Sequence, residues 1–150
     1  MAVRSEGTLS AGRDEVNPQA GIDCAQDIYN QAGITNPLKE IDCAEIYVPF
    51  SWYEPMWLEN LGFCELGEGW KLTDQGATAM GGEMPFNMSG GVLSSNPIGA
   101  SGMIRFGEAA LQVMGLGEDH QVDGAKVAMG HAYGGAAQFF AMWIVSSEKS

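Results

Sequence analysis

The chain has 150 residues, 45% of them hydrophobic, which suits a single domain built around one core. Its 19 acidic and 7 basic residues give a net charge of −12, which disfavours binding to nucleic acids and anionic membrane surfaces. The three cysteines contain no CxxC pair and cannot all be paired in disulfides, so they predict reduced thiols, a cytoplasmic location and no metal site. The longest apolar run, FFAMWIV, is too short to span a bilayer, and a soluble chain without a membrane partner is expected.

The amino-terminal part of the chain predicts an arm, a helix and a buried strand. Residues 1–17 have neither helical nor strand periodicity and predict an arm or loop, with the folded domain over residues 18–150. Apolar residues at helical spacing predict a helix that begins near residue 18 and ends at Gly33. The segment EIDCAEIYVPF then predicts a buried strand whose carboxyl end lies at residues 47–49.

The middle of the chain predicts one more helix and a long loop. SWYEPMWLENLGF, residues 51–63, predicts a helix with Ser51 as its N-cap, Pro55 in its first turn and Gly62 near its end. Residues 64–85 contain five glycines and no clear period, which predicts a loop with at most one short strand.

The carboxyl-terminal part predicts a helix and two strands. GMIRFGEAALQVMG is apolar on all sides, as expected for a buried helix. AKVAMGHAY and QFFAMWIVSS are two apolar runs separated by GGAA, which predicts an antiparallel pair. The order of these elements predicts an α/β fold, a mixed β-sheet covered by helices.

A tight, glycine-rich turn, SGGVLSSNPIGASG at residues 89–102, precedes the last helix. Glycines let a backbone turn sharply and approach a substrate, and a helix N-terminus offers free amides and a partial positive charge. The turn therefore predicts an oxyanion site.

Four stretches in order resemble the carboxyl-terminal half of the thiolase superfamily: AEIYVPFSWYEPMWLENLGFCELGEG, MPFNMSGGVLSSNPIGASG, RFGEAALQVMG and VAMGHAYGGAAQFF. With the helix before them they cover roughly residues 18–147, and they are most similar to sterol-carrier-type thiolases and thiolase-like aldolases of steroid side-chain degradation. The resemblance implies a thiolase-like half, either a separate subunit or an excised fragment. The other half of such enzymes carries the nucleophilic cysteine and most contacts to coenzyme A.

The sequence departs from the family pattern at its polar positions. In the family pattern Gly-His-Pro-x-Gly-Ala-Thr-Gly, Asn96 stands where the histidine would be, and an amide can stabilise an enolate but cannot shuttle a proton at pH 7. The Asn-Glu-Ala-Phe or His-Asp-Cys-Phe segment of the family corresponds to residues 47–50, which places Tyr47 at its polar position. The late turn, matched to within about two residues, brings His131 and Tyr133 to the place of a cysteine or a His-Asn pair.

The resemblance therefore implies four candidate catalytic residues, Tyr133, Tyr47, Asn96 and His131, and the candidate substrate contacts Phe50, Ser95, Gly99, Gly134 and Gly135. Some residues in this region also fit a structural role in the core. Tyr47 fits a core residue as well as a catalyst, and His131 fits a hydrogen-bonded structural histidine. Glu45 either orients Tyr47 or a water, or forms a salt bridge across a subunit contact, whereas Cys43 fits simple packing.

Two tyrosines and an asparagine, without the cysteine relay, favour a reaction through an enolate that needs no acyl-enzyme. Retro-aldol cleavage of a β-hydroxyacyl-CoA fits this description, with Tyr133 as acid or base. The resemblance implies a steroid side chain as the acyl group. The alternatives are a true thiolase half that transfers acetyl groups to coenzyme A, and a non-catalytic scaffold that completes the fold of a partner.

The resemblance also implies cofactors and partners. No cofactor is expected in this chain, and coenzyme A enters only as part of the substrate thioester. The implied partners are a thiolase-like chain with the amino-terminal half and a small protein that combines a zinc ribbon with an OB-fold. A dimer of such heteromers is expected, because thiolases pair through their sheets.

Overall fold

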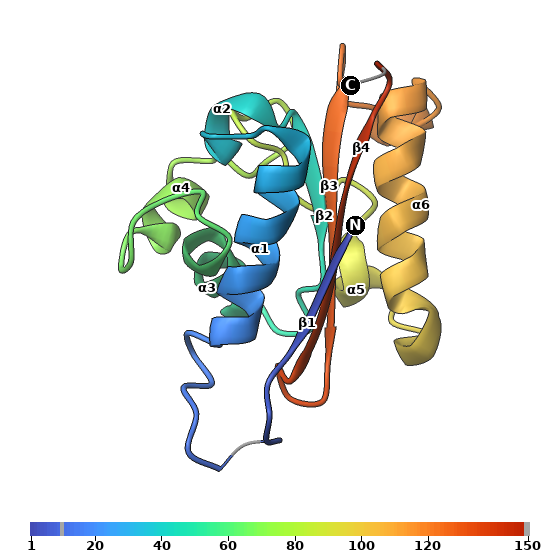
Figure 1. Cartoon of the computed structure of the whole chain (residues 1–150). Helices are drawn as coiled ribbons and strands as arrows, with labels where there is room; N and C mark the ends of the chain where they lie inside the picture. Colours follow the sequence, from blue (N-terminus) through green and yellow to red (C-terminus); the bar gives the residue numbers. More distant parts are fainter. Residues whose placement is uncertain (10, 149–150) are drawn as a thin grey trace.

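The computed structural model of the chain describes residues 1–9 and 11–148 (Figure 1). Its strands and helices, in chain order, are β1 (Ala2–Ser5), α1 (Gln19–Ala32), α2 (Pro37–Glu40), β2 (Cys43–Ile46), α3 (Tyr53–Asn60), α4 (Gly69–Asp74), α5 (Gly91–Ser94), α6 (Ser101–Met114), β3 (Val127–Gly134) and β4 (Phe139–Ser146). Short 3₁₀ turns lie at Ile98–Ala100 and Glu118–His120. None of the described helices is long and apolar enough to cross a membrane.

The four strands form one mixed sheet in the order β1-β4-β3-β2. The hairpin of β3 and β4 is antiparallel, as the sequence predicts, and β1 pairs antiparallel with β4. β2 runs parallel to β3, with Ile46 opposite His131. Because the carboxyl ends of parallel strands meet at one edge, residues that follow β2 and residues near the end of β3 lie close together.

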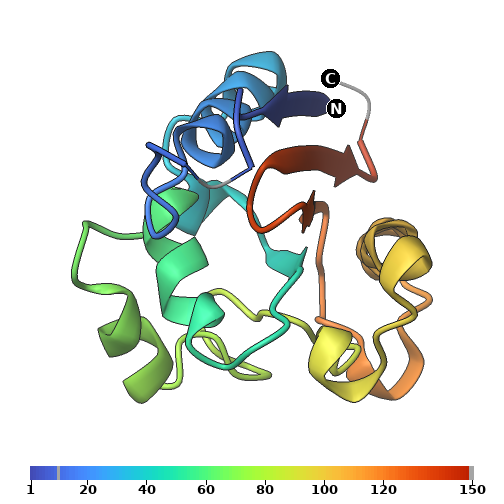
Figure 2. The ribbon, with the colours of Figure 1, turned by 90° about the horizontal axis from the view of Figure 1, so that it is seen from below.

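Helices cover both faces of this sheet, and the two faces differ in their packing (Figures 1 and 2). On one face lie α1 to α4, with the main hydrophobic core beneath them. Its largest fully buried side chains include Trp57, Phe140, Met129 and Met142. α1 ends at Gly33, which has a left-handed φ of 71° as expected for a glycine that closes a helix.

α6 covers the other face with an unusual distribution of side chains. Its buried residues are Ser101, Arg105, Ala109 and Gln112, which are small or polar. Its exposed side includes three large apolar residues, Met103, Phe106 and Met114, which are 71%, 41% and 64% exposed. The expectation of a helix buried on all sides is therefore wrong for this chain, because no described element covers the outer side of α6.

Small residues allow α6 and β4 to approach β3 closely. A Cβ atom on Gly102, in the first turn of α6, would lie 2.8 Å from the Cβ atom of Ala132. A Cβ atom on Gly130 would lie 1.8 Å from the indole nitrogen of Trp143. Larger residues at either glycine would push the helix or the indole away from the sheet.

Three local predictions need correction. Residues 2–5, predicted as part of an irregular arm, form β1, whose main-chain bonds to β4 compensate for its weak apolar alternation. Ser51 does not cap α3, which begins at Tyr53 after Trp52 without a side-chain cap. The predicted loop of residues 64–85 contains α4, a short helix that packs against α3.

Candidate functional site

The candidate site begins at the contact between Tyr47 and Asn96. Tyr47 follows β2, and its hydroxyl donates to Oδ1 of Asn96 at 3.1 Å. The main chain of Tyr47 is also fixed, since its carbonyl accepts a hydrogen bond from the Trp57 indole at 3.0 Å. The structure thus brings together two of the residues that the sequence predicts for the site.

The side-chain amide of Asn96 is held in one orientation. Its Oδ1 also accepts from the Ser101 hydroxyl at 2.6 Å and from the main-chain N–H of Ile98 at 3.3 Å. An N–H group can only donate, so the oxygen of the amide must face Ile98. The Nδ2 group of Asn96 then points away from these donors and has no partner among the described residues, which leaves an amide donor at an exposed position.

Tyr133, near the end of β3, lies directly beside Tyr47. The two rings meet edge to face with centroids 5.1 Å apart, and the Tyr53 ring stacks on Tyr133 at 5.6 Å. Burial raises the pKa of the Tyr133 hydroxyl above its ordinary value, and the neighbouring Tyr53 hydroxyl adds to this shift. Tyr133 therefore keeps its proton at neutral pH and is suited to donate it rather than to act as a base.

His131 is fully buried two residues before Tyr133 on β3. Its Nδ1 accepts the main-chain N–H of Tyr47 at 3.3 Å, and its ring lies 5.0 Å from that of Trp57. Burial lowers the pKa of His131 to about 3, so the imidazole is neutral at physiological pH. This environment favours a structural role for His131, since the ring holds the end of β2 in place.

The predicted substrate contacts surround this cluster at the surface. Phe50 is 62% exposed, and its ring stacks on that of Tyr53 with centroids 6.1 Å apart. Ser95 and Gly99 lie in the exposed segment on either side of Asn96. Gly134 and Gly135 follow Tyr133, and a Cβ atom on Gly134 would meet no atom within 4 Å. All five residues border open space, as substrate contacts require.

Sequence reasoning missed an arginine that supports the turn after Tyr133. Ala136 and Ala137 both have left-handed φ values, 50° and 62°, a conformation that costs about 1 kcal/mol or more for each residue other than glycine. Arg13, from the segment before α1, donates to the carbonyls of both alanines. Its guanidinium also donates to the carbonyl of Leu9. Consecutive alanines in a hairpin turn are the one sequence signal that could have pointed to such a support.

No cysteine of the chain is placed to act as a nucleophile at this site. Cys24 and Cys43 are buried, and Cys64 is half-buried. Burial raises the pKa of each thiol, to about 11 for Cys24 and Cys64 and about 12 for Cys43. The packing interpretation of Cys43 therefore agrees with its surroundings. In the described part of the chain, no three histidine, cysteine or acidic side chains are placed to hold a metal ion.

The basic side chains of the described residues are already engaged. Five of the lysines and arginines pair with carboxylates: Arg4 with Asp27, Lys39 with Glu83, Lys71 with Glu68, Arg105 with Glu45 and Lys126 with Glu148. Arg13 is bound to the carbonyls of the β3–β4 turn, and Lys149 lies outside the described residues.

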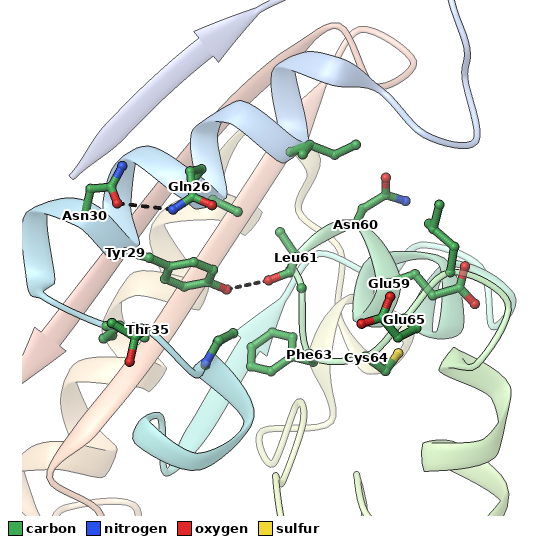
Figure 3. A pocket seen from close by; sticks show the side chains of 16 residues that line it. Gln26, Tyr29, Asn30, Thr35, Glu59, Asn60, Leu61, Phe63, Cys64 and Glu65 are labelled. Carbon is green, nitrogen blue, oxygen red and sulfur yellow. Dashed lines mark hydrogen bonds between the residues drawn. The ribbon is translucent and has the colours of Figure 1, made fainter.

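A hollow of the described surface lies apart from these residues (Figure 3). It has a volume of about 800 Å³ and is formed by α1 and the segment 59–66. Tyr29 bridges its walls by donating to the carbonyl of Leu61 at 2.7 Å. No predicted catalytic or substrate-contact residue lines this hollow.

Comparison with known proteins shows the family of this chain. The Thiolase C-terminal domain-like family matches residues 3–147, and the chain belongs to this family. The acetyl-CoA acetyltransferase of Methanothermobacter thermautotrophicus is 32% identical over 97% of the chain, which spans 38% of that protein. Human sterol carrier protein 2 is 37% identical over 75% of the chain and is matched over 20% of its own length.

Two further relatives extend the comparison. The benzoylsuccinyl-CoA thiolase subunit BbsB of Thauera aromatica is 31% identical over 91% of the chain, and the match covers 35% of that subunit. Among solved structures, a chain of an Ltp2-ChsH2(DUF35) aldolase matches 99% of this chain with a TM-score of 0.78 and 24% identity. The match covers 39% of that chain. The protein thus spans well under half the length of these relatives, and its likeness to the aldolase shows a shared fold.

Proposed function

We propose that this chain is a subunit of a split thiolase-like aldolase. It would cleave the Cα–Cβ bond of a β-hydroxyacyl-CoA with a steroid side chain, giving a ketone and a shorter acyl-CoA. The observation that carries the proposal is the arrangement of Tyr133, Tyr47 and Asn96, which offers a retained phenol proton and a free amide donor at one edge of the sheet.

Each step of the reaction has a candidate group. A base removes the proton of the β-hydroxyl, the Cα–Cβ bond breaks, and the bonding electrons pass to the thioester as an enolate. The Nδ2 group of Asn96 would donate a hydrogen bond to the enolate oxygen, a type of interaction worth about 3 kcal/mol in other enzymes. Tyr133 would then protonate the enolate carbon. Burial lowers the pKa of His131 to about 3, which makes it a weak base, and Tyr133 holds its proton, so we assign the initial base to the partner.

Two observations support a partner that carries the other thiolase half. The chain has only 7 basic residues for the phosphates of coenzyme A, so most of that binding is assigned to another chain. An almost entirely apolar hollow of about 400 Å³ lies between α6 and the sheet, where Met103 and Phe106 face Trp143 of β4. Exposed apolar surface of this kind is typical of an interface. The small zinc-ribbon and OB-fold partner, and pairing of two such complexes, remain part of this proposal.

Aromatic surface next to Tyr133 supports the steroid part of the proposal. Trp52 is 53% exposed and stacks on Tyr53 at 4.2 Å, and Phe50 stacks on the same ring. These rings offer a flat apolar surface to the group that leaves as a ketone. The aldolase with the same fold and the sterol carrier relatives are consistent with such a substrate.

One experiment separates this proposal from its alternatives. The complex purified from its own cells is supplied with a β-hydroxyacyl-CoA of a steroid side chain, and the ketone and shorter acyl-CoA are measured by mass spectrometry. Their formation in equal amounts supports the aldolase. Acetyl transfer to free coenzyme A would instead support the thiolase, in keeping with the name of the 32% identical acetyl-CoA acetyltransferase. Unchanged turnover in both Tyr133→Phe and Tyr47→Phe variants would support the scaffold.

A further inference from the structure

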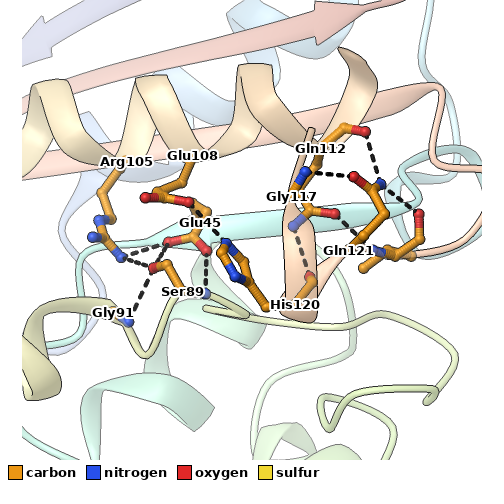
Figure 4. A network of polar contacts seen from close by, with 10 residues as sticks. Glu45, Ser89, Gly91, Arg105, Glu108, Gln112, Gly117, His120 and Gln121 are labelled. Carbon is orange, nitrogen blue, oxygen red and sulfur yellow. Dashed lines mark hydrogen bonds and ion pairs between the residues drawn. The ribbon is translucent and has the colours of Figure 1, made fainter. Parts of the chain in front are cut away.

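A buried charge cluster joins the strand that precedes Tyr47 to the helix that follows Asn96 (Figure 4). Glu45 lies on β2 and is fully buried, and Arg105 lies on α6 and is 2% exposed. Nη1 of Arg105 is 2.5 Å from Oε2 of Glu45. The salt bridge expected as one possibility for Glu45 therefore forms within this chain rather than across a subunit contact.

Ser89 brings the loop before α5 into the same cluster. Its N–H donates to Oε1 of Glu45 at 3.0 Å, and its hydroxyl donates to Oε2 at 2.9 Å. The Ser89 oxygen in turn accepts from Nη1 of Arg105 at 2.9 Å and from the N–H of Gly91 at 3.2 Å. One buried carboxylate thus fixes three segments: β2, the loop that leads to Asn96, and α6.

These three segments carry both partners of the contact at the candidate site. Tyr47 lies two residues after Glu45, whereas Asn96 lies between Ser89 and Arg105 in the chain. The segment from α5 to α6 is exposed from Leu93 to Ala100, so few other contacts hold Asn96 in place. The remaining ones are its own bonds to Tyr47, Ile98 and Ser101.

A second polar cluster on α6 holds a different segment of the chain from the first. Gln112, also fully buried, donates to the carbonyl of His120 at 2.8 Å and accepts the N–H of Val122 at 2.7 Å. These bonds tie α6 to the segment that follows it, and none of them involves residues 89–100 (Figure 4). The buried glutamine therefore provides a matched control for the loss of a buried polar group in the same helix.

We infer that the Glu45–Arg105–Ser89 cluster is a positioning device that sets the place of Asn96 relative to Tyr47. None of its three side chains lies at the exposed surface where a substrate would bind. The effect of the cluster on catalysis rests on the proposed function. Its effect on how firmly residues 94–101 are held in place does not. Misplacement of a catalytic group by about 1 Å can lower a rate by about a hundredfold, so modest movement of Asn96 would be visible in kcat.

The test uses the complex purified from its own cells and three variants of this chain. Ser89→Ala removes the three hydrogen bonds of the hydroxyl, one donated and two accepted, at little steric cost. The double variant Glu45→Gln with Arg105→Met removes both charges together, which avoids leaving one buried charge unpaired. Gln112→Met is the control. Amide hydrogen exchange of residues 94–101, kcat, KM and the melting temperature are measured for each.

A specific pattern is expected of these variants. Ser89→Ala and the double variant should speed exchange over residues 94–101 by about fivefold or more. They should also lower kcat by about tenfold with little change in KM. Gln112→Met should lower the melting temperature to a similar extent without either change. If Ser89→Ala and the double variant behave like Gln112→Met, the cluster only stabilises the fold and the inference is overturned. If the wild-type complex cleaves no substrate, the proposed function fails, and the exchange measurement still decides the inference.

Discussion

The two faces of the sheet are packed with different kinds of side chain. The face under α1 and α3 is closed by large apolar side chains such as Trp57 and Phe140. The face under α6 is covered by small residues and buried polar groups of that helix, whereas the larger Met103 and Phe106 stay partly exposed beside it, with the Phe106 ring 5.6 Å from that of Trp143 on β4. A surface helix normally buries its large apolar residues against its own sheet. The exposed apolar residues of α6 therefore support the proposed contact with a partner.

The candidate site lies where these two faces meet, at the carboxyl edge of β2 and β3. Tyr133 and His131 point into the face that contains Trp57, and Asn96 belongs to the turn that begins α6. Tyr47 contacts both sides, through the Tyr133 ring and the Asn96 amide. The face under α1 and α3, the closed face, thus supplies a rigid wall beside the candidate site. The face under α6, the open face, supplies the amide donor of Asn96 and the exposed apolar side chains of Met103 and Phe106.

The largest expected effect comes from removing the phenol of the closed face. Tyr133→Phe in the purified complex should lower turnover of the β-hydroxyacyl-CoA by about a hundredfold or more, because general acids contribute at least this much. Assembly should be unchanged, since the ring remains. Tyr29→Phe removes a buried hydroxyl far from the site and serves as the control. Turnover near that of the wild type would exclude Tyr133 as the proton donor.

A second variant tests whether burial in the closed face keeps His131 neutral. Unfolded histidine has a pKa near 6.5, whereas burial holds that of His131 at about 3, so the unfolded chain takes up more protons between these values. Stability should therefore fall as the pH falls from 7 to 5, by about 2 kcal/mol from this residue. His131→Gln should remove that part of the pH dependence.

Chemical denaturation at pH 7 and pH 5 measures the effect of His131→Gln. The second histidine, His120, is only partly buried beside Glu108, and His120→Gln is the matched control. An identical pH dependence in the wild type and His131→Gln would show that His131 is not held neutral by burial.

The third prediction addresses the open face. Replacing Met103 and Phe106 together by aspartate should lower recovery of the partner chain at least about tenfold, because it places charge in the apolar contact. Co-purification with a tagged chain measures this. Met80→Asp changes a methionine of similar exposure in the loop after α4 and should leave recovery unchanged. Equal recovery from all three chains would place the partner elsewhere.

The smallest effect is expected at the turn after Tyr133. Arg13→Gln should lower the free energy of unfolding by about 1 kcal/mol, since the carbonyls of two strained alanines lose a charged donor. Arg4→Gln breaks an exposed pair with Asp27 and should cost less, about 0.5 kcal/mol or below. Urea denaturation compares the two, and equal losses would mean that Arg13 gives the turn no special support.

Periodic segments of the sequence are predictable, and short or long-range features are not. The apolar spacing of α1 and of the β3–β4 hairpin matches the structure because side-chain burial decides those elements. β1 and α4 have four and six residues, too few for a pattern to show. The pairing of Glu45 with Arg105 spans 60 positions and depends on how α6 packs, which no local pattern encodes.

The sequence predicts the candidate residues of the site but not the contacts that hold them. The family pattern places Tyr47, Asn96 and Tyr133 at matching positions, and the structure brings these residues into one cluster. The orientation of the Asn96 amide depends on Ser101 and Ile98, and the burial of His131 depends on Trp57. Such contacts arise only when the sheet and its helices are assembled.

We propose that another thiolase-like chain completes the open face. The most direct test is the native mass of the chain purified by a tag from its own cells, with every co-purifying protein identified by mass spectrometry. We expect a stable complex that contains a chain with the amino-terminal thiolase half. A well-folded monomer with α6 exposed to solvent would contradict the claim.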